Sequence, residues 1–252
     1  MFKFYKSARY KGYFLSIGES KMSKFKKFNR RYYNFIRPFV AFYSLLWIIY
    51  NKLTSKFIIP YIELVITTNC NLKCEDCLHL INLYGVDNHK HSQNIVCEEL
   101  LDDINILAEN SDRICVLKLI GGEPFLYKEL HILIDEIDKI KNIDTVQITT
   151  NGVTTPNKEN IRALKSNKVL VVFSGYSINP NKTNKILKIF DENKINYRIE
   201  PLDGEWTDMG IFEPKKRNKK ENMEIFENCG FSACNSLLNR YIYVLELLMQ
   251  IT

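Results

Sequence analysis

The chain has 252 residues, of which 46% are hydrophobic and 25% charged, values typical of a globular protein and not of a disordered one. Its seven cysteines are odd in number and clustered, which argues against a disulfide framework. The net charge of +6 is uneven: residues 1–60 carry thirteen Lys or Arg and one acid, and the rest carries twenty-two bases and twenty-eight acids. We therefore expect an acidic partner for the basic N-terminal part.

The first residues do not have the features of a cleavable signal peptide. The opening "MFKFYKSARYKGYF" lacks an apolar core that ends in small residues. We therefore expect a reducing, cytoplasmic setting, in which clustered cysteines serve as metal ligands or redox groups.

A basic segment with interleaved aromatic residues (21–37) precedes an apolar run of twelve residues (39–50). A membrane-spanning helix needs about 20 apolar residues, and a run of about 10–14 is more often a core or interfacial helix. Two interpretations are equally supported. One is a helix on an anionic bilayer, with peripheral membrane contact through residues 21–50; the other is a helix packed on the domain. An arm that binds nucleic acid is the weaker reading, because no known binding module follows.

From residue 61 onward, strand-like and helix-like patterns alternate. Strands are predicted over 61–67, 114–120, 144–150, 168–174 and 195–200. Helices are predicted over 97–110, 127–140, 157–166 and 181–193. This alternation predicts an α/β fold with a parallel sheet and right-handed crossovers, and the pattern alone leaves open sheet and barrel undecided.

The loops after the first four predicted strands are polar and rich in glycine or cysteine. They read "TTNCNLKCEDC", "GGEP" (121–124), "TTNG" (149–152) and "SGYS" (174–177). Ligands bind at the carboxyl ends of parallel strands, and these ends share one edge of the sheet. We therefore expect the four loops to form one site.

Three cysteines, Cys70, Cys74 and Cys77, lie in the first loop with the spacing C-x3-C-x2-C. A structural zinc site needs four ligands, and His79 could be the fourth. A redox pair of Cys74 and Cys77 leaves Cys70 without a role. Three thiolates on an iron–sulfur cluster leave one iron open for a ligand. Zinc, a redox pair, a cluster and three ordinary buried cysteines all remain open at this point.

The cysteine loop, "GGEP" and "TTNG", in this order after successive strands, resemble the radical S-adenosylmethionine (radical SAM) enzymes over residues 60–201. The resemblance implies a [4Fe–4S] cluster on Cys70, Cys74 and Cys77, with S-adenosylmethionine on the fourth iron. It implies reductive cleavage of this cofactor to a 5′-deoxyadenosyl radical that abstracts hydrogen from a substrate. It also implies a partial (β/α)6 barrel and an electron donor such as flavodoxin or ferredoxin.

The resemblance also assigns roles to residues of the other loops. The backbone of Gly121 and Gly122 is expected near the methionine end of the cofactor, since glycine allows close approach. Glu123 is expected either to add charge complementarity or to be structural, and Pro124 to stiffen the turn. Further cofactor contacts are expected from Thr150, Asn151 and Ser174. Asp76 departs from the family, which often has an aromatic residue before the third cysteine.

Near the C-terminus, Cys229 and Cys234 precede a segment that resembles the start of an auxiliary-cluster region with a short hairpin. That resemblance implies further cysteines, which are absent from the sequence. We therefore expect a region truncated relative to its relatives; the alternative is two ordinary cysteines. Cys97 and Cys115 are expected in the core.

The sequence thus divides into three expected parts: a basic and aromatic extension with an amphipathic or interfacial helix (1–58), a radical SAM core (59–205) and an incomplete C-terminal cysteine region (206–252). The expected function is that of a radical SAM enzyme acting on a peptide, a protein or a cell-surface sugar precursor. The alternatives are an inactive or truncated relative that binds a cluster or zinc without catalysis, and a glycyl-radical activating enzyme.

Overall fold

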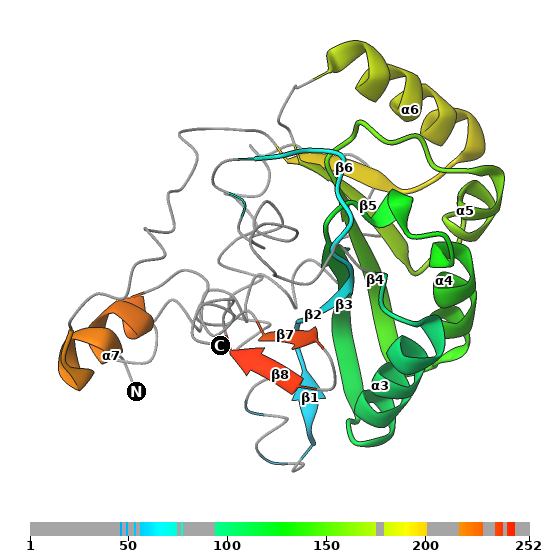
Figure 1. Cartoon of the computed structure of the whole chain (residues 1–252). Coiled ribbons are helices and arrows are strands. Elements are labelled where there is room, and N and C mark those ends of the chain that lie inside the picture. Colours follow the sequence, from blue (N-terminus) through cyan, green and yellow to red (C-terminus); the bar gives the residue numbers. More distant parts are fainter. Residues whose placement is uncertain are drawn as a thin grey trace.

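The computed structural model describes residues 56–74, 77, 94–174, 179–200, 217–228, 235–238 and 241–244, together with positions 46, 49 and 53. An eight-stranded sheet forms its centre, in the order β6-β5-β4-β3-β2-β7-β8, with β1 paired to β3 (Figure 1). The strands are β1 (Ile58–Ile59), β2 (Ile62–Thr67), β3 (Arg113–Gly121), β4 (Ile143–Thr150), β5 (Val169–Ser174), β6 (Tyr197–Glu200), β7 (Asn235–Leu238) and β8 (Tyr241–Val244). The helices are α3 (Cys97–Glu109), η3 (Pro124–Leu126), α4 (Leu130–Lys139), α5 (Lys158–Ala163), α6 (Pro180–Asn193) and α7 (Lys219–Asn228).

Every described strand pair except β7–β8 is parallel. The predicted α/β class and parallel sheet are therefore confirmed. Within the described strands the sheet is open at β6 and β8, as in a partial (β/α)6 barrel. The short antiparallel hairpin expected near the C-terminus is also present, as β7 and β8.

Helices α3, α4, α5 and α6 lie on one face of the sheet (Figure 1). Alternate strand residues such as Leu64, Leu117 and Val171 point into this layer and are fully buried with Leu133 and Phe190 of the helices. Burial of each such side chain contributes roughly 1.5–3 kcal/mol relative to exposure, so this layer supplies the main stabilisation of the sheet. The remaining strand residues face the opposite side, and many of them are polar.

Local signals set the ends of the helices. The Asn157 side chain accepts a hydrogen bond from Asn160 N (2.7 Å) at the start of α5, and the Asn179 side chain accepts one from Lys182 N (3.1 Å) at the start of α6. Helix α4 begins three residues later than predicted because the turn η3 precedes it. The sequence did not predict β1 or α7.

Several predicted features lie outside the described residues: the basic segment 21–37, Asp76, His79, Cys229 and Cys234. Leu46, Ile49 and Leu53 are helical, and their exposed fractions are 49%, 46% and 81%. Within the described part, no helix is both long enough and apolar enough to cross a bilayer.

Candidate functional site

The cysteine loop leaves the carboxyl end of β2. Asn94 anchors its start, because Asn94 Oδ1 accepts hydrogen bonds from Thr67 Oγ1 (2.7 Å) and Asn69 Nδ2 (2.9 Å). The Leu72 N–H donates to Cys70 Sγ at 3.4 Å. The first residues of the loop therefore lie at the strand end, where the other loops also arrive.

The three thiols of the loop are free and partly buried, and Cys74 and Cys77 lie close enough to Cys70 to act on it electrostatically. Burial raises the pKa of Cys70; the bond from Leu72 opposes this shift, and negative charge on Glu123, Cys77 and Cys74 adds to it. Among the described residues, no group of three or more His, Cys, Asp or Glu side chains is close enough to hold a metal ion. Cysteine thiols are the ligands that iron–sulfur clusters use, and these three residues supply such a donor set.

The two glycines of "GGEP" pack against the backbone that leads into the cysteine loop. Gly122 N donates to Thr67 O (2.7 Å), and the next residue, Glu123, donates from its N to Asn69 O (2.7 Å). A Cβ on Gly121 would lie 2.1 Å from Thr67 O, and a Cβ on Gly122 would lie 2.0 Å from Asn69 O. Glycine is therefore required at both positions, because the neighbouring backbone leaves no room for a side chain. The sequence did not predict this packing.

Glu123 joins the second loop to the third and is fully buried. Its Oε1 accepts hydrogen bonds from Phe125 N (3.1 Å) and Thr150 Oγ1 (2.8 Å), and its Oε2 accepts one from Asn151 N (2.9 Å). Burial raises the pKa of Glu123 to about 7, while the bonds from Asn151, Thr150 and Phe125 act in the opposite direction. Of the two roles expected for Glu123, these contacts favour the structural one.

The "TTNG" loop contacts the cysteine loop directly. Asn151 Nδ2 donates to Asn71 Oδ1 (2.8 Å), and Asn71 Nδ2 donates to Thr154 Oγ1 (3.1 Å). Asn151 Oδ1 also accepts from Val153 N (2.9 Å). The sequence reading missed Asn71, although its position directly after the first cysteine was the available signal.

Pro124 is buried at the first position of η3, as a turn-stiffening residue should be. Ser174 is the last residue of β5 and is partly exposed, and its register partner on β6 is Glu200. Residues 175–178 after it lie outside the described part. The structure therefore brings the first three predicted loops together by hydrogen bonds and places Ser174 at the same edge of the sheet.

The central part of the chain is similar to known proteins. The family model of the radical SAM superfamily matches residues 64–202. A GTP 3′,8-cyclase of Aquifex aeolicus is 31% identical over 127 residues, which are 50% of this chain and 38% of the relative. One from Clostridium acetobutylicum is 30% identical over 145 residues, 58% of this chain and 42% of the relative. The chain thus spans less than half the length of these relatives.

The solved structures that the chain matches include Streptococcus suis SuiB bound to S-adenosylmethionine, at 16% sequence identity and a TM-score of 0.47. The match covers 72% of this chain and 42% of that chain. Native anSMEcpe with bound AdoMet matches at 21% identity and a TM-score of 0.44, covering 56% of this chain and 44% of that chain.

Proposed function

The chain belongs to the radical SAM superfamily, and from this membership we propose that it is an enzyme that forms a 5′-deoxyadenosyl radical and uses it to abstract hydrogen from a substrate. When bound, a reduced [4Fe–4S] cluster supplies the electron that breaks a carbon–sulfur bond of S-adenosylmethionine, giving methionine and the radical. One observation carries the proposal: Glu123, Gly122 and Asn151 tie the cysteine, "GGEP" and "TTNG" loops into one hydrogen-bonded unit at the carboxyl edge of a parallel sheet.

In this proposal Cys70, Cys74 and Cys77 hold the cluster. Gly121, Gly122 and Pro124 present backbone to the methionine end of the cofactor, because the packing against Thr67 and Asn69 fixes their course. Three further residues, Thr150, Asn151 and Ser174, are proposed contacts of the cofactor at the same edge.

Glu123 acts differently, as a positioning residue. Both of its carboxylate oxygens already accept hydrogen bonds within the protein. Its effect on the cofactor therefore passes through the course of the two loops that it joins.

The substrate is proposed separately, because the chain spans less than half of its cyclase relatives. The name of these relatives makes GTP one candidate. A peptide, a protein or a cell-surface sugar precursor is the alternative.

Anaerobic purification and reconstitution with iron and sulfide test the proposal. A radical SAM enzyme should hold about four irons per chain and release 5′-deoxyadenosine when reduced with dithionite in the presence of S-adenosylmethionine. Retention of the cluster without 5′-deoxyadenosine would identify a relative that binds the cluster without catalysis. A colourless protein with one zinc would refute the proposal.

We further propose peripheral membrane contact through the N-terminal part. Leu46, Ile49 and Leu53 are each helical and exposed, and their sequence spacing of three and four residues is typical of one face of an amphipathic helix. The excess of basic residues in 1–60 supplies attraction to anionic lipids.

A further inference from the structure

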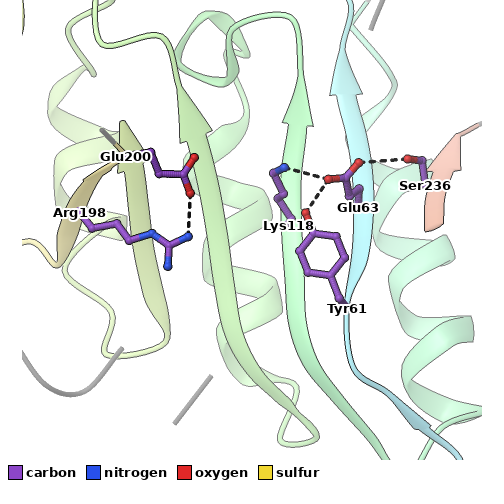
Figure 2. A network of polar contacts seen from close by, with 6 residues as sticks. All are labelled: Tyr61, Glu63, Lys118, Arg198, Glu200 and Ser236. Carbon is purple, nitrogen blue, oxygen red and sulfur yellow. Dashed lines mark hydrogen bonds and ion pairs between the residues drawn. The ribbon is translucent and has the colours of Figure 1, made fainter. Parts of the chain in front are cut away.

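The strand β2, from which the cysteine loop departs, has a neighbour on each side. Near its start, Ser236 of β7 donates to Glu63 Oε2 at 3.2 Å, and Lys118 of β3 donates to Glu63 Oε1 at 2.8 Å (Figure 2). At its end the neighbour on the side away from β3 is Asn94, which forms an antiparallel bridge with Thr67. The last residue of β2 is therefore fixed from both sides before the cysteine loop begins.

Asn94 also binds this end of the strand through its side chain. Its Oδ1 accepts hydrogen bonds from Thr67 Oγ1 at 2.7 Å and from Asn69 Nδ2 at 2.9 Å, and its Nδ2 donates none within the described part of the chain. The N–H of the next residue, Ile95, donates to Ile66 O at 3.2 Å. Thr67 and Asn94 are 27 residues apart in the sequence, and all three cysteines of the loop lie between them. Asn94 thus joins the two ends of the segment that carries the cysteines.

This role differs from that of a helix cap. Asparagine near the start of a helix commonly caps it, but the N-cap of α3 is Val96, which makes no side-chain cap bond. Asn94 is exposed, and both bonds to its side-chain oxygen come from the strand end. Hydrogen bonds at an exposed position contribute modestly to the stability of a whole fold, so we expect the effect of Asn94 to be local to the cysteine loop.

The residue that follows Asn94 is fixed from a second direction. Tyr127 Oη donates to Ile95 O at 2.8 Å, and Tyr127 is only 1% exposed. Tyr127 directly follows η3, the turn that continues the "GGEP" loop. Asn94 therefore meets the strand end as an acceptor whose own position is set by the buried part of the protein.

Cys70 lies between two asparagines that are bonded to different parts of the chain. On one side Asn69 donates to Asn94, and on the other side Asn71 accepts a hydrogen bond from Asn151 Nδ2 at 2.8 Å. Both sequence neighbours of Cys70 are thus held by side-chain bonds. The position of the thiol depends on these two supporting contacts.

We propose that Asn94 is a positioning residue for the iron–sulfur cluster: by holding Thr67 and Asn69, it fixes Cys70 where its thiolate binds iron. This inference rests on the proposed function, since it takes Cys70 as a cluster ligand. A ligand that is already in place loses less conformational freedom on binding, and such preorganisation slows release of what is bound. Loss of the Asn94 side chain should therefore weaken retention of the cluster while the sheet stays folded.

Anaerobic release of iron from the reconstituted protein to a chelator tests the proposal. Asn94→Ala and Asn69→Ala should each release iron about tenfold faster than the wild type, and the double variant no faster than either, because the two residues act through one contact. Asn94→Asp keeps an acceptor oxygen for both donors, so its rate should stay within about twofold of the wild type. Asn110→Ala is the matched control: Asn110 is an exposed asparagine at the C-terminal end of α3 whose Nδ2 donates to Ile106 O, and its loss should leave the rate unchanged.

Alkylation of the cluster-free protein by iodoacetamide, read by mass spectrometry, gives a second measure that needs no iron. Asn94→Ala should speed the alkylation of Cys70 about tenfold, because the thiol is no longer held in its partly buried position. Cys97 is buried at the start of α3 and should react as slowly as in the wild type. Slow alkylation of Cys97 thus reports that the variant is folded.

Three results would overturn the positioning role. They are an equal rise in iron release in Asn110→Ala, release from Asn94→Asp as fast as from Asn94→Ala, and alkylation of Cys70 and Cys97 that rises together. The proposed function fails separately, when the wild type itself binds no iron. A wild type that holds iron, with an Asn94→Ala variant that releases iron and alkylates Cys70 at wild-type rates, would refute the positioning role alone.

Discussion

The Thr150 hydroxyl donates a 2.8 Å hydrogen bond to the carboxylate of Glu123, although Thr150 ends β4 and Glu123 lies two residues beyond the end of β3. This contact, with those from Phe125 and Asn151, makes one buried acid the junction of two loops. The stability of the edge should therefore depend on this acid.

Glu123→Ala would leave three donors without their acceptor in a fully buried position. We expect a loss of about 3 kcal/mol in the free energy of unfolding, measured by urea denaturation. Glu136→Ala on α4 is the control; Glu136 pairs with Lys139 in an exposed position, so its loss should change stability by less than about 0.5 kcal/mol. Equal losses in both variants would contradict the junction role.

The raised pKa of Glu123 predicts a pH-dependent stability. Burial raises the pKa of this carboxyl from 4.5 to about 7, so between these values the folded chain holds a proton that the unfolded chain has lost. The contribution of this carboxyl to the free energy of unfolding is fully present below pH 4.5. It falls by about 3 kcal/mol as the pH rises to 7. Urea denaturation between pH 5 and 8 should show this fall relative to Glu123→Gln. Parallel pH curves for the two proteins would show that Glu123 does not titrate there.

The glycines of the site should differ in their tolerance of alanine. Gly121→Ala and Gly122→Ala each place a Cβ far inside the van der Waals distance of a backbone oxygen, at 2.1 and 2.0 Å. Gly152 also has a positive φ of 72°, but a Cβ there would first meet the Phe173 ring, at 3.0 Å. We expect Gly152→Ala to lower the melting temperature least, since its cost is mainly the left-handed backbone, about 1–2 kcal/mol. A larger drop for Gly152→Ala than for Gly122→Ala would contradict the packing described here.

Cysteines inside and outside the loop should behave differently. Cys74→Ala should abolish both the bound iron and the formation of 5′-deoxyadenosine, because it removes a proposed cluster ligand. Cys115→Ala changes a buried cysteine of β3 and should retain both. Iron analysis and chromatography of the reaction products measure the two outcomes; retained iron in Cys74→Ala would refute its assignment as a ligand.

Leu53→Ser should weaken membrane binding, because Leu53 is the most exposed of the three apolar helix residues. Sedimentation with vesicles of phosphatidylserine and phosphatidylcholine measures the effect, and binding should fall further as salt is added. Ile132→Ser, at an exposed apolar residue of α4, is the control. Equal binding by wild type and Leu53→Ser would count against this surface.

The sequence predicted the sheet and the meeting of its loops because both depend on repeating patterns and on strand direction. It did not predict which loops bond to each other. Glu123 and Asn151 are 28 residues apart, and Glu63 and Lys118 are 55 apart, so only the strand order brings them together. The sequence predicted that the glycines of "GGEP" let the cofactor approach, whereas the approach of Thr67 and Asn69, which leaves room only for glycine, depends on the register of β2 and β3.

The pairing of β7 with β2 has a consequence for how the chain acquires its structure. Ser236 and Glu63 lie 173 residues apart in the sequence. We therefore expect β7 to pair with β2 later in folding than the strand pairs that are linked by a single helix. Until β7 arrives, β2 presents one unpaired side of a six-residue strand, IELVIT, that is buried in the finished protein. Exposed strand sides of this kind recruit other chains. Aggregation during synthesis is therefore the expected failure when the last strands are deleted or delayed, even though they lie outside the cofactor loops.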